Sequence, residues 1–235
     1  MISIILIEPK RQENLGAIAR SMKNFGFENL VLVNPKCKIG KSAIKVAKHG
    51  KSILDKVKIK DFSYLKRFDY LIGTSAILGT DYNIPRNAIN AEQLAGRLSN
   101  IKQKNSKSKL KIGILIGREN IGLKNEEINL CDILVSIPAS KKYPTLNISH
   151  ACSIVLYELF KKLSLENSTS NINFATKKDK DIIMKYMNKA LNEIEFSTKE
   201  KKETQKIVWK RVIGKAMLTK REAFAVMGFL RKLEK

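Results

Sequence analysis

Residues 112–123 read Ile112-Gly113-Ile114-Leu115-Ile116-Gly117-Arg118-Glu119-Asn120-Ile121-Gly122-Leu123, an apolar run followed by a charged loop between two glycines. Such a run is typical of a strand buried on both faces, as in parallel sheets. Open parallel sheets bind ligands in loops at the carboxyl ends of their strands. The glycine spacing matches neither a dinucleotide-binding fingerprint nor a phosphate-binding P-loop. The stretch therefore predicts an α/β fold with another kind of ligand site beside Gly117. The alternative is a plain turn with a local Arg118–Glu119 pair.

Short β-branched runs alternate with helical stretches on both sides of this segment. Such alternation indicates a mostly parallel sheet flanked by helices. We expect further strands at Ser3–Ile7, Leu30–Val33, Tyr70–Ile72 and Ile133–Ile137. We expect helices at Glu13–Phe25, Lys41–His49, Ala91–Leu98 and Ser149–Leu163, and a polar loop at Lys102–Lys109.

The composition of the chain changes after the last of these helices. We expect an α/β domain at 1–163, a linker rich in Ser, Asn and Thr at 164–176, and a small all-helical domain at 177–235. Ser197–Glu200 and Thr219–Glu222 match the capping box, a pattern that opens helices. The expected helix starts are near Asp179, Thr198 and Lys220.

The chain is strongly basic, with 45 Lys and Arg residues against 22 Asp and Glu residues and a net charge of +23. This excess favours a polyanionic partner such as RNA. A lysine-rich proteome with solvated side chains is the alternative explanation. Candidate phosphate contacts in the last third of the chain are Lys199, Lys201, Lys202, Lys206, Lys210, Arg211, Lys215, Lys220 and Arg221. Trp209 is assigned to the helical core, with base stacking as the alternative.

Membrane and metal-binding classes are disfavoured by the sequence. The apolar start Ile2–Ile7 is too short to cross a bilayer, so we expect a cytoplasmic protein without a membrane segment. The three cysteines, Cys37, Cys131 and Cys152, form no CxxC pair, which argues against disulfides and zinc. With only two histidines besides, we expect no metal site.

Two more motifs occupy strand-to-helix junctions. Asn14-Leu15-Gly16-Ala17-Ile18-Ala19-Arg20 follows the first strand, and its small residues permit close approach while Arg20 is able to hold a phosphate. A helix with a solvated arginine is the alternative. The second motif runs from Ile137 to Ala151 and contains two prolines. In isolation, Asn147 and Ser149 there are explained as helix caps.

In this order and at these junctions, the three motifs resemble the SpoU/TrmH family of RNA ribose 2'-O-methyltransferases. The Gly73-Thr74-Ser75-Ala76 turn, the Asn83-Ile84-Pro85-Arg86 stretch and the basic helical tail are similar to the TrmJ-like branch, which modifies the tRNA anticodon loop. The resemblance implies a trefoil knot at the carboxyl side of the sheet, S-adenosylmethionine as cofactor and a homodimer. General topology rules argue against knots, so this feature rests on the resemblance alone.

The resemblance also implies roles for individual residues. The implied cofactor-binding residues are Thr74, Ser75, Ala76, Gly117, Ile137, Pro144, Thr145, Leu146 and Asn147; Thr145 stands where the family usually has serine. The implied catalytic residues are Arg20, Asn14 and Glu119. A guanidinium stays protonated in proteins, so Arg20 is expected to fix the target phosphate and activate the ribose hydroxyl electrostatically rather than act as a base. Asn14 and Glu119 would then orient that hydroxyl.

The function implied is S-adenosylmethionine-dependent methylation of a ribose 2'-hydroxyl in tRNA. The expected target is anticodon-loop position 32, a cytidine, with uridine as a further candidate. Two alternatives stay open: a ribosomal RNA 2'-O-methyltransferase, and a non-catalytic basic RNA-binding or assembly factor.

Overall fold

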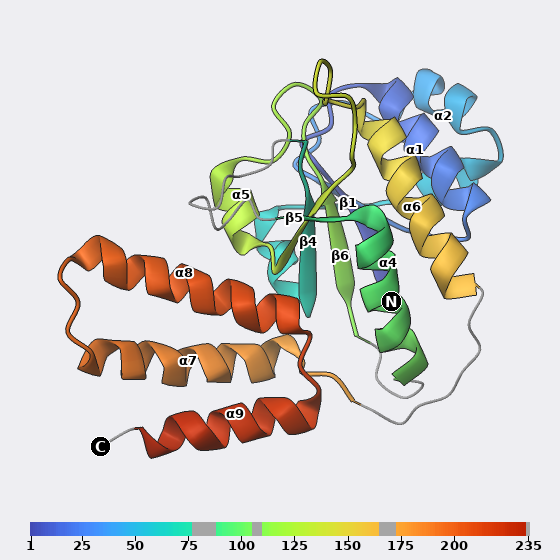
Figure 1. Cartoon of the computed structure of the whole chain (residues 1–235). Coiled ribbons are helices and arrows are strands. Elements are labelled where there is room, and N and C mark those ends of the chain that lie inside the picture. Colours follow the sequence, from blue (N-terminus) through green and yellow to red (C-terminus); the bar gives the residue numbers. More distant parts are fainter. Residues whose placement is uncertain (77–87, 105–109, 165–172, 234–235) are drawn as a thin grey trace.

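A computed structural model describes residues 1–76, 88–104, 110–164 and 173–233 of the chain (Figure 1). The stretch 83–86, which supported the resemblance to the TrmJ-like branch, lies outside these residues. The described residues form a parallel sheet with helices on both faces, followed by three further helices to one side (Figure 1).

The sheet contains seven strands in the order β3-β2-β1-β6-β4-β7-β5, and every pairing between them is parallel. The strands are β1 (Ile2–Ile7), β2 (Asn29–Val33), β3 (Lys58–Lys60), β4 (Tyr70–Thr74), β5 (Ala88–Asn90), β6 (Ile112–Ile116) and β7 (Ile133–Ser136). The strand quoted first, β6, lies between β1 and β4, so it is covered by strands on both sides. The predicted parallel sheet flanked by helices is confirmed.

Alternating side chains of the strands supply two separate cores. Ile4 and Leu6 of β1 point into one core, while Ile5 and Ile7 point into the other. The first core is covered by α1 (Gln12–Asn24), α2 (Lys41–Ala47), α3 (Lys51–Leu54), α4 (Ala91–Lys104) and α6 (Ile148–Ser164). The second is covered by α5 (Asn125–Leu130) and the 3₁₀ helix η2 (Phe62–Arg67). Double-sided burial explains the unbroken apolar runs in the sequence.

The last three helices, called here the tail helices, are α7 (Lys177–Glu193), α8 (Lys199–Ala216) and α9 (Lys220–Lys232). They have an apolar cluster of their own, in which Ile183, Met187 and Ile213 are buried. Threonines cap their amino termini: Thr176 and Thr219 form capping boxes with Asp179 and Glu222. At α8 the cap is Thr198 rather than the expected Ser197, since Thr198 Oγ1 accepts from the Lys201 amide at 3.2 Å.

The tail helices are attached at the amino-terminal ends of strands β4 and β7, here called the amino-terminal edge of the sheet, away from α1 and α6 (Figure 1). The Tyr70 hydroxyl donates to the Ala175 carbonyl at 3.0 Å. Phe174 and Ala175 are buried, so residues 173–176, which fall in the predicted linker, pack against the rest of the chain. Ser164, the first residue of the predicted linker, is the last residue of α6.

Several element boundaries differ from the expectations. The strands β3 and β5 and the helices α3 and α5 were not expected. The helix expected at Ala91–Leu98 continues to Lys104, so the predicted polar loop at Lys102–Lys109 was wrong at its start. The helix expected at Lys41–His49 ends at Ala47 and continues as the 3₁₀ helix η1 (Lys48–Gly50).

Within the described residues, no helix is both long and apolar enough to cross a membrane. In the same residues, no group of three or more His, Cys, Asp or Glu side chains is placed to hold a metal ion. Burial raises the pKa of the Cys131 and Cys152 thiols to about 12, so both stay protonated near neutral pH.

Candidate active site

A pocket lies at the carboxyl ends of β4, β6 and β7. The following residues line it: Thr74, Ser75, Ala76, Ile116, Gly117, Arg118, Glu119, Asn120, Ile121, Gly122, Leu123, Val135, Ile137, Pro144, Thr145, Leu146, Ile148 and Ala151. The structure thus brings together eight of the nine residues expected to bind the cofactor. The ninth, Asn147, caps α6 instead, because its Oδ1 accepts from the Ser149 amide and hydroxyl at 2.8 Å each.

The loop after β6, residues 117–123, forms one wall of this pocket. The Arg118 amide donates to the Gly122 carbonyl and the Gly122 amide donates to the Arg118 carbonyl, both at 3.0 Å. Gly122 has a φ of +64°, a conformation that side chains disfavour. A Cβ on Gly117 would lie 2.2 Å from the Gly122 carbonyl carbon. Both glycines are therefore needed for the tight return of the loop.

Arg118 fixes the base of this loop from inside the protein. Its Nη2 and Nη1 donate to the two Glu127 carboxylate oxygens at 2.8 and 2.9 Å, and its Nε donates to Glu8 Oε2 at 2.9 Å. The guanidinium holds the pKa of Glu8 below its ordinary value, chiefly through this hydrogen bond. The alternative of a local Arg118–Glu119 pair is wrong, because Arg118 binds carboxylates from other elements.

Glu119, the next residue, connects the loop to the first motif. Its Oε1 accepts from the Lys10 and Arg11 amides at 3.1 and 3.0 Å and from Asn14 Nδ2 at 3.2 Å. Burial raises the pKa of Glu119, but its hydrogen bonds outweigh this and the net shift is downward. Glu119 is therefore an ionised carboxylate that already accepts several hydrogen bonds. It is suited to positioning rather than to proton abstraction. Asn14, itself buried, reaches the pocket through this carboxylate.

The turn after β4 is held by backbone and hydroxyl contacts. The Thr74 hydroxyl donates to the Leu115 carbonyl at 3.0 Å, and the Ser75 amide donates to the Val135 carbonyl at 2.9 Å. These bonds tie the ends of β4, β6 and β7 together, so the pocket has a fixed floor. Exposed Ile121 and the Pro144–Leu146 segment add an apolar rim.

Arg20 is not part of the pocket of its own chain. It is exposed on α1 and does not line the pocket. Six residues along a helix correspond to about 240° of rotation, so Arg20 and buried Asn14 face different sides of α1. Arg20 instead lies next to Ser21, whose hydroxyl is 2.6 Å from the Ser153 hydroxyl of α6.

Comparisons with known proteins agree with this site. The model of the SpoU rRNA methylase family matches residues 1–157, which include all three motifs. The chain belongs to this family of methyltransferases. The resemblance inferred from the motifs is thereby confirmed.

Individual members of the SpoU family match almost the whole chain. The tRNA (cytidine-2'-O-)-methyltransferase TrmJ of Methanocaldococcus jannaschii is 40% identical over 232 residues, covering 97% of each chain. The enzyme of the same name from Sulfolobus acidocaldarius is 34% identical and covers 99% of this chain and 93% of its own. The crystal structure of TrmJ from Z. mobilis ZM4 aligns with a TM-score of 0.70 at 23% identity over 100% of both chains, which supports the fold.

Two expectations about the tail of this family member were wrong. Trp209 is 37% exposed rather than part of the helical core. Arg211 is 4% exposed, so its guanidinium is buried among protein atoms and does not present itself to a phosphate. Both lie on α8, where the hydrophobic period identifies a helix but not which of its sides the neighbours cover.

Proposed function

We propose that this chain transfers a methyl group from S-adenosylmethionine to a ribose 2'-hydroxyl of tRNA. The observation that carries the proposal is the pocket at the carboxyl edge of the sheet, built from the turn after β4 and the loops at 117–123 and 137–151, all within the residues that the SpoU family model matches. The tRNA methyltransferase relatives match α7–α9 as well as the sheet, whereas the family model ends at residue 157. Similarity along the tail favours tRNA over ribosomal RNA. An intact catalytic set of Arg20, Asn14 and Glu119 argues against a non-catalytic factor.

The pocket residues suit S-adenosylmethionine chemically. Backbone groups at Thr74–Ala76 and Gly117 offer hydrogen bonds, while Ile137, Pro144 and Leu146 offer apolar contact for a flat base. A side chain on Gly117 would collide with the backbone of Gly122 and Leu123, so glycine there keeps the shape of the loop that forms one wall of the pocket. Once bound, the cofactor supplies a methyl group on a positively charged sulfur. Thr145 keeps the hydroxyl of the usual serine, and Asn147 acts by holding the start of α6.

Residues of the chain orient the acceptor and stabilise its developing charge. Arg20 fixes the phosphate next to the target ribose and lowers the pKa of the 2'-hydroxyl electrostatically. Glu119 at the pocket wall, with Asn14 bound to it, positions the substrate side of the site. Alignment of donor and acceptor accounts for much of the rate.

We also propose a homodimer in which Arg20 serves the pocket of the other chain. Ile154, Tyr157 and Phe160 of α6 are 37%, 50% and 43% exposed and form an apolar stripe. Phe25, the residue that follows α1, contacts both aromatic rings of that stripe, with centroids 6.0 and 5.8 Å away. Two copies that meet over this stripe would cover it and bring each α1, with Arg20, to the partner.

The finer parts of the proposal follow the resemblance and the relatives. The chain carries the trefoil knot of the SpoU/TrmH family, and residues 177–235 serve as its tRNA-binding domain. The proposed target is position 32 of the anticodon loop, which follows the resemblance alone; the names of the relatives from Methanocaldococcus jannaschii and Sulfolobus acidocaldarius specify cytidine. Because the substrate is tRNA, the activity belongs in the cytoplasm.

A methyl-transfer assay tests the choice of substrate. Labelled S-adenosylmethionine is supplied with bulk tRNA and ribosomal RNA, and the modified nucleotide is then mapped. Label on ribosomal RNA alone would contradict the proposed choice of tRNA.

Arg20 variants test the electrostatic role. Arg20→Ala is expected to lower kcat by about 10²- to 10³-fold, because one oriented cation at the reacting oxygen is lost. Arg20→Lys keeps a positive charge and should retain part of that activity. Single-turnover methyl transfer at saturating tRNA measures both. Equal and complete loss with unchanged tRNA binding would argue against a purely electrostatic role, and full activity in both would remove Arg20 from the mechanism.

Coexpression of two inactive variants tests the dimer. Arg20→Ala lacks the cation, and Gly117→Ala has a methyl group in collision with the loop. If Arg20 acts across the interface, each mixed dimer has one complete site, so random pairing restores about a quarter of the wild-type activity. Each variant expressed alone gives the baseline. No recovery, with mixed dimers verified by mass, would place Arg20 in its own chain's site.

A further inference from the structure

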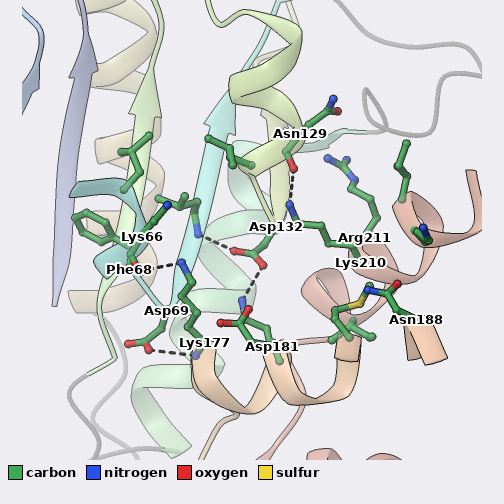
Figure 2. A pocket seen from close by; sticks show the side chains of 18 of the residues that line it. Lys66, Phe68, Asp69, Asn129, Asp132, Lys177, Asp181, Asn188, Lys210 and Arg211 are labelled. Carbon is green, nitrogen blue, oxygen red and sulfur yellow. Dashed lines mark hydrogen bonds and ion pairs between the residues drawn. The ribbon is translucent and has the colours of Figure 1, made fainter. Parts of the chain in front are cut away.

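A second cavity, of about 560 Å³, lies between the amino-terminal edge of the sheet and helices α7 and α8 (Figure 2). It is called here the tail cleft. On one side it is lined by η2 and the start of β4, and on the other by side chains of α7 and α8. None of its residues belongs to the pocket at the carboxyl edge.

The two walls of the tail cleft are held at a fixed separation (Figure 2). Asp132 joins them, since its Oδ2 accepts from the Leu71 amide at 2.8 Å and its Oδ1 accepts from Lys180 Nζ at 2.7 Å. Lys180 Nζ also lies 3.7 Å from the ring centroid of Tyr70. This ion pair is largely buried, with side-chain exposures of 9% and 15%. The cleft is therefore formed before any ligand arrives.

The charge of the tail cleft is positive. Its lining contains the amines of Lys66, Lys177, Lys180, Lys206 and Lys210 against the carboxylates Asp69, Asp132 and Asp181. Lys180 is paired with Asp132 and Lys206 with Glu203, and the Arg211 guanidinium is buried, so Lys66, Lys177 and Lys210 are the cations left for a ligand. Lys177 and Lys210 donate to the backbone carbonyls of Lys66 and Asn129 at 2.9 and 2.6 Å. A carbonyl carries no net charge, so these two ammonium groups keep theirs. The cleft thus offers cations to an anionic ligand.

The floor of the tail cleft is apolar. Leu65, Phe68, Leu71 and Ile213 are buried there at 1%, 4%, 6% and 6% exposure. Leu130 and Ile207 stand at the rim with 49% and 39% exposure. Apolar surface beneath ammonium groups matches a nucleotide, whose base packs on the floor while its phosphate meets the amines.

We infer that the tail cleft binds a phosphate and base of the substrate tRNA outside the nucleotide being methylated. The inference rests on the proposed function. Strands β4 and β6 have five residues each, so the amino-terminal and carboxyl-terminal ends of the strands lie roughly 17 Å apart. At about 3.4 Å per nucleotide along a stacked strand, roughly five nucleotides span that distance. One RNA is long enough to fill the pocket and the cleft together. Contact through backbone and base face raises affinity without selecting a base.

Charge reversal at the rim tests the inference in the full-length protein. Lys66 contributes only its backbone carbonyl to the contact with Lys177, so Lys66→Glu leaves that contact in place. We expect it to weaken tRNA binding about tenfold and to lower the slope of log Kd against log salt by about one or more. Leu130→Ser should weaken tRNA binding with little change in this slope, because it removes apolar surface alone.

Two exposed residues of β3, on the far edge of the sheet, provide matched controls. Lys58→Glu changes the same charge, and Ile59→Ser removes an apolar side chain that is 59% exposed. Both should bind tRNA as the wild type does. Hydrogen exchange should slow at 62–71 and 206–213 when tRNA binds.

Outcomes separate this inference from the proposed function. An unchanged tRNA Kd in Lys66→Glu and Leu130→Ser would contradict tRNA binding in the tail cleft. Equal losses in the β3 controls would contradict it as well. Neither result would affect the proposed methyl transfer, which is measured in the wild type. Protection of the cleft by an acidic peptide and not by tRNA would also overturn tRNA binding there. Absence of methyl transfer to tRNA by the wild type would instead contradict the proposed function.

Discussion

Gly117→Ala is expected to abolish binding of S-adenosylmethionine and, with it, methyl transfer. The added Cβ would lie 2.2 Å from the Gly122 carbonyl carbon and 2.4 Å from the Leu123 amide nitrogen, and both of these are backbone atoms. Real contacts of a Cβ are well over 3 Å, so the loop must move by about 1 Å or more. Such a shift breaks the paired 3.0 Å hydrogen bonds between Arg118 and Gly122.

Calorimetry should show at least about a 100-fold loss of S-adenosylmethionine affinity, because a misplacement of about 1 Å removes aligned contacts. The free energy of unfolding of Gly117→Ala should be about 1–3 kcal/mol lower than that of the wild type, as is usual for overpacking. Gly228→Ala on α9 is the matched control, since nothing lies within 4 Å of a Cβ there. It should bind the cofactor normally. Wild-type affinity in Gly117→Ala would show that the loop does not form the cofactor wall.

The strands at the centre of the sheet were predictable, and those at its edges were not. β1 and β6 are buried on both faces and so appear as continuous apolar runs. β3 reads Lys58-Ile59-Lys60 with every residue exposed, which leaves no burial pattern to detect. α5 spans six residues, too few for a helical period to emerge.

The pocket lining was predictable because the turn after β4 and the loops at 117–123 and 137–151 each follow a strand, and the carboxyl ends of parallel strands meet on one side of a sheet. The partners of Arg118 were not. Glu8 is 110 residues away and adopts a φ of +45°, and Glu127 opens a helix that had no sequence signal. Glu119 looked like the partner of Arg118 by proximity alone, yet the start of α1 takes its carboxylate. Long-range pairing of charges is set by the fold, not by local spacing.

The helices of the tail were predictable from the sequence, but the way they attach to the sheet was not. The helices were expected from periodicity and from two capping boxes, of which Thr219–Glu222 is confirmed, whereas Thr198 replaces Ser197 as the cap of α8. The attachment of the tail to the sheet depends on contacts between distant residues: Lys180 of α7 binds Asp132, 48 residues away, and Gly214 of α8 lies against the same aspartate. On α8 Arg211 is buried, and Trp209 on another side of the helix stays partly exposed. An exposed tryptophan on a basic helix is available for base stacking.

Arg118→Ala is expected to cause the largest loss of stability. Arg118 and Glu127 are each 5% exposed, and the pair is bidentate at 2.8 and 2.9 Å. Removing the guanidinium leaves the buried Glu127 carboxylate without its cation and releases Glu8. Breaking a buried pair from one side costs about 3–5 kcal/mol. Urea unfolding at pH 7 measures the loss, and Lys51→Ala, which removes an exposed ion pair, should change the free energy of unfolding far less.

The loss in Arg118→Ala should depend on pH in a definite direction. Arg118 lowers the pKa of Glu8 from its ordinary 4.5, so the Glu8 ion pair stabilises the folded state above that value and fades as the pH falls through the lowered one. The variant lacks this pair at every pH. The difference in unfolding free energy between wild type and variant should therefore be greatest near neutral pH and shrink below about pH 4.5. An equal difference at pH 7 and pH 4 would mean that the Glu8 ion pair contributes nothing to the stability that Arg118 provides.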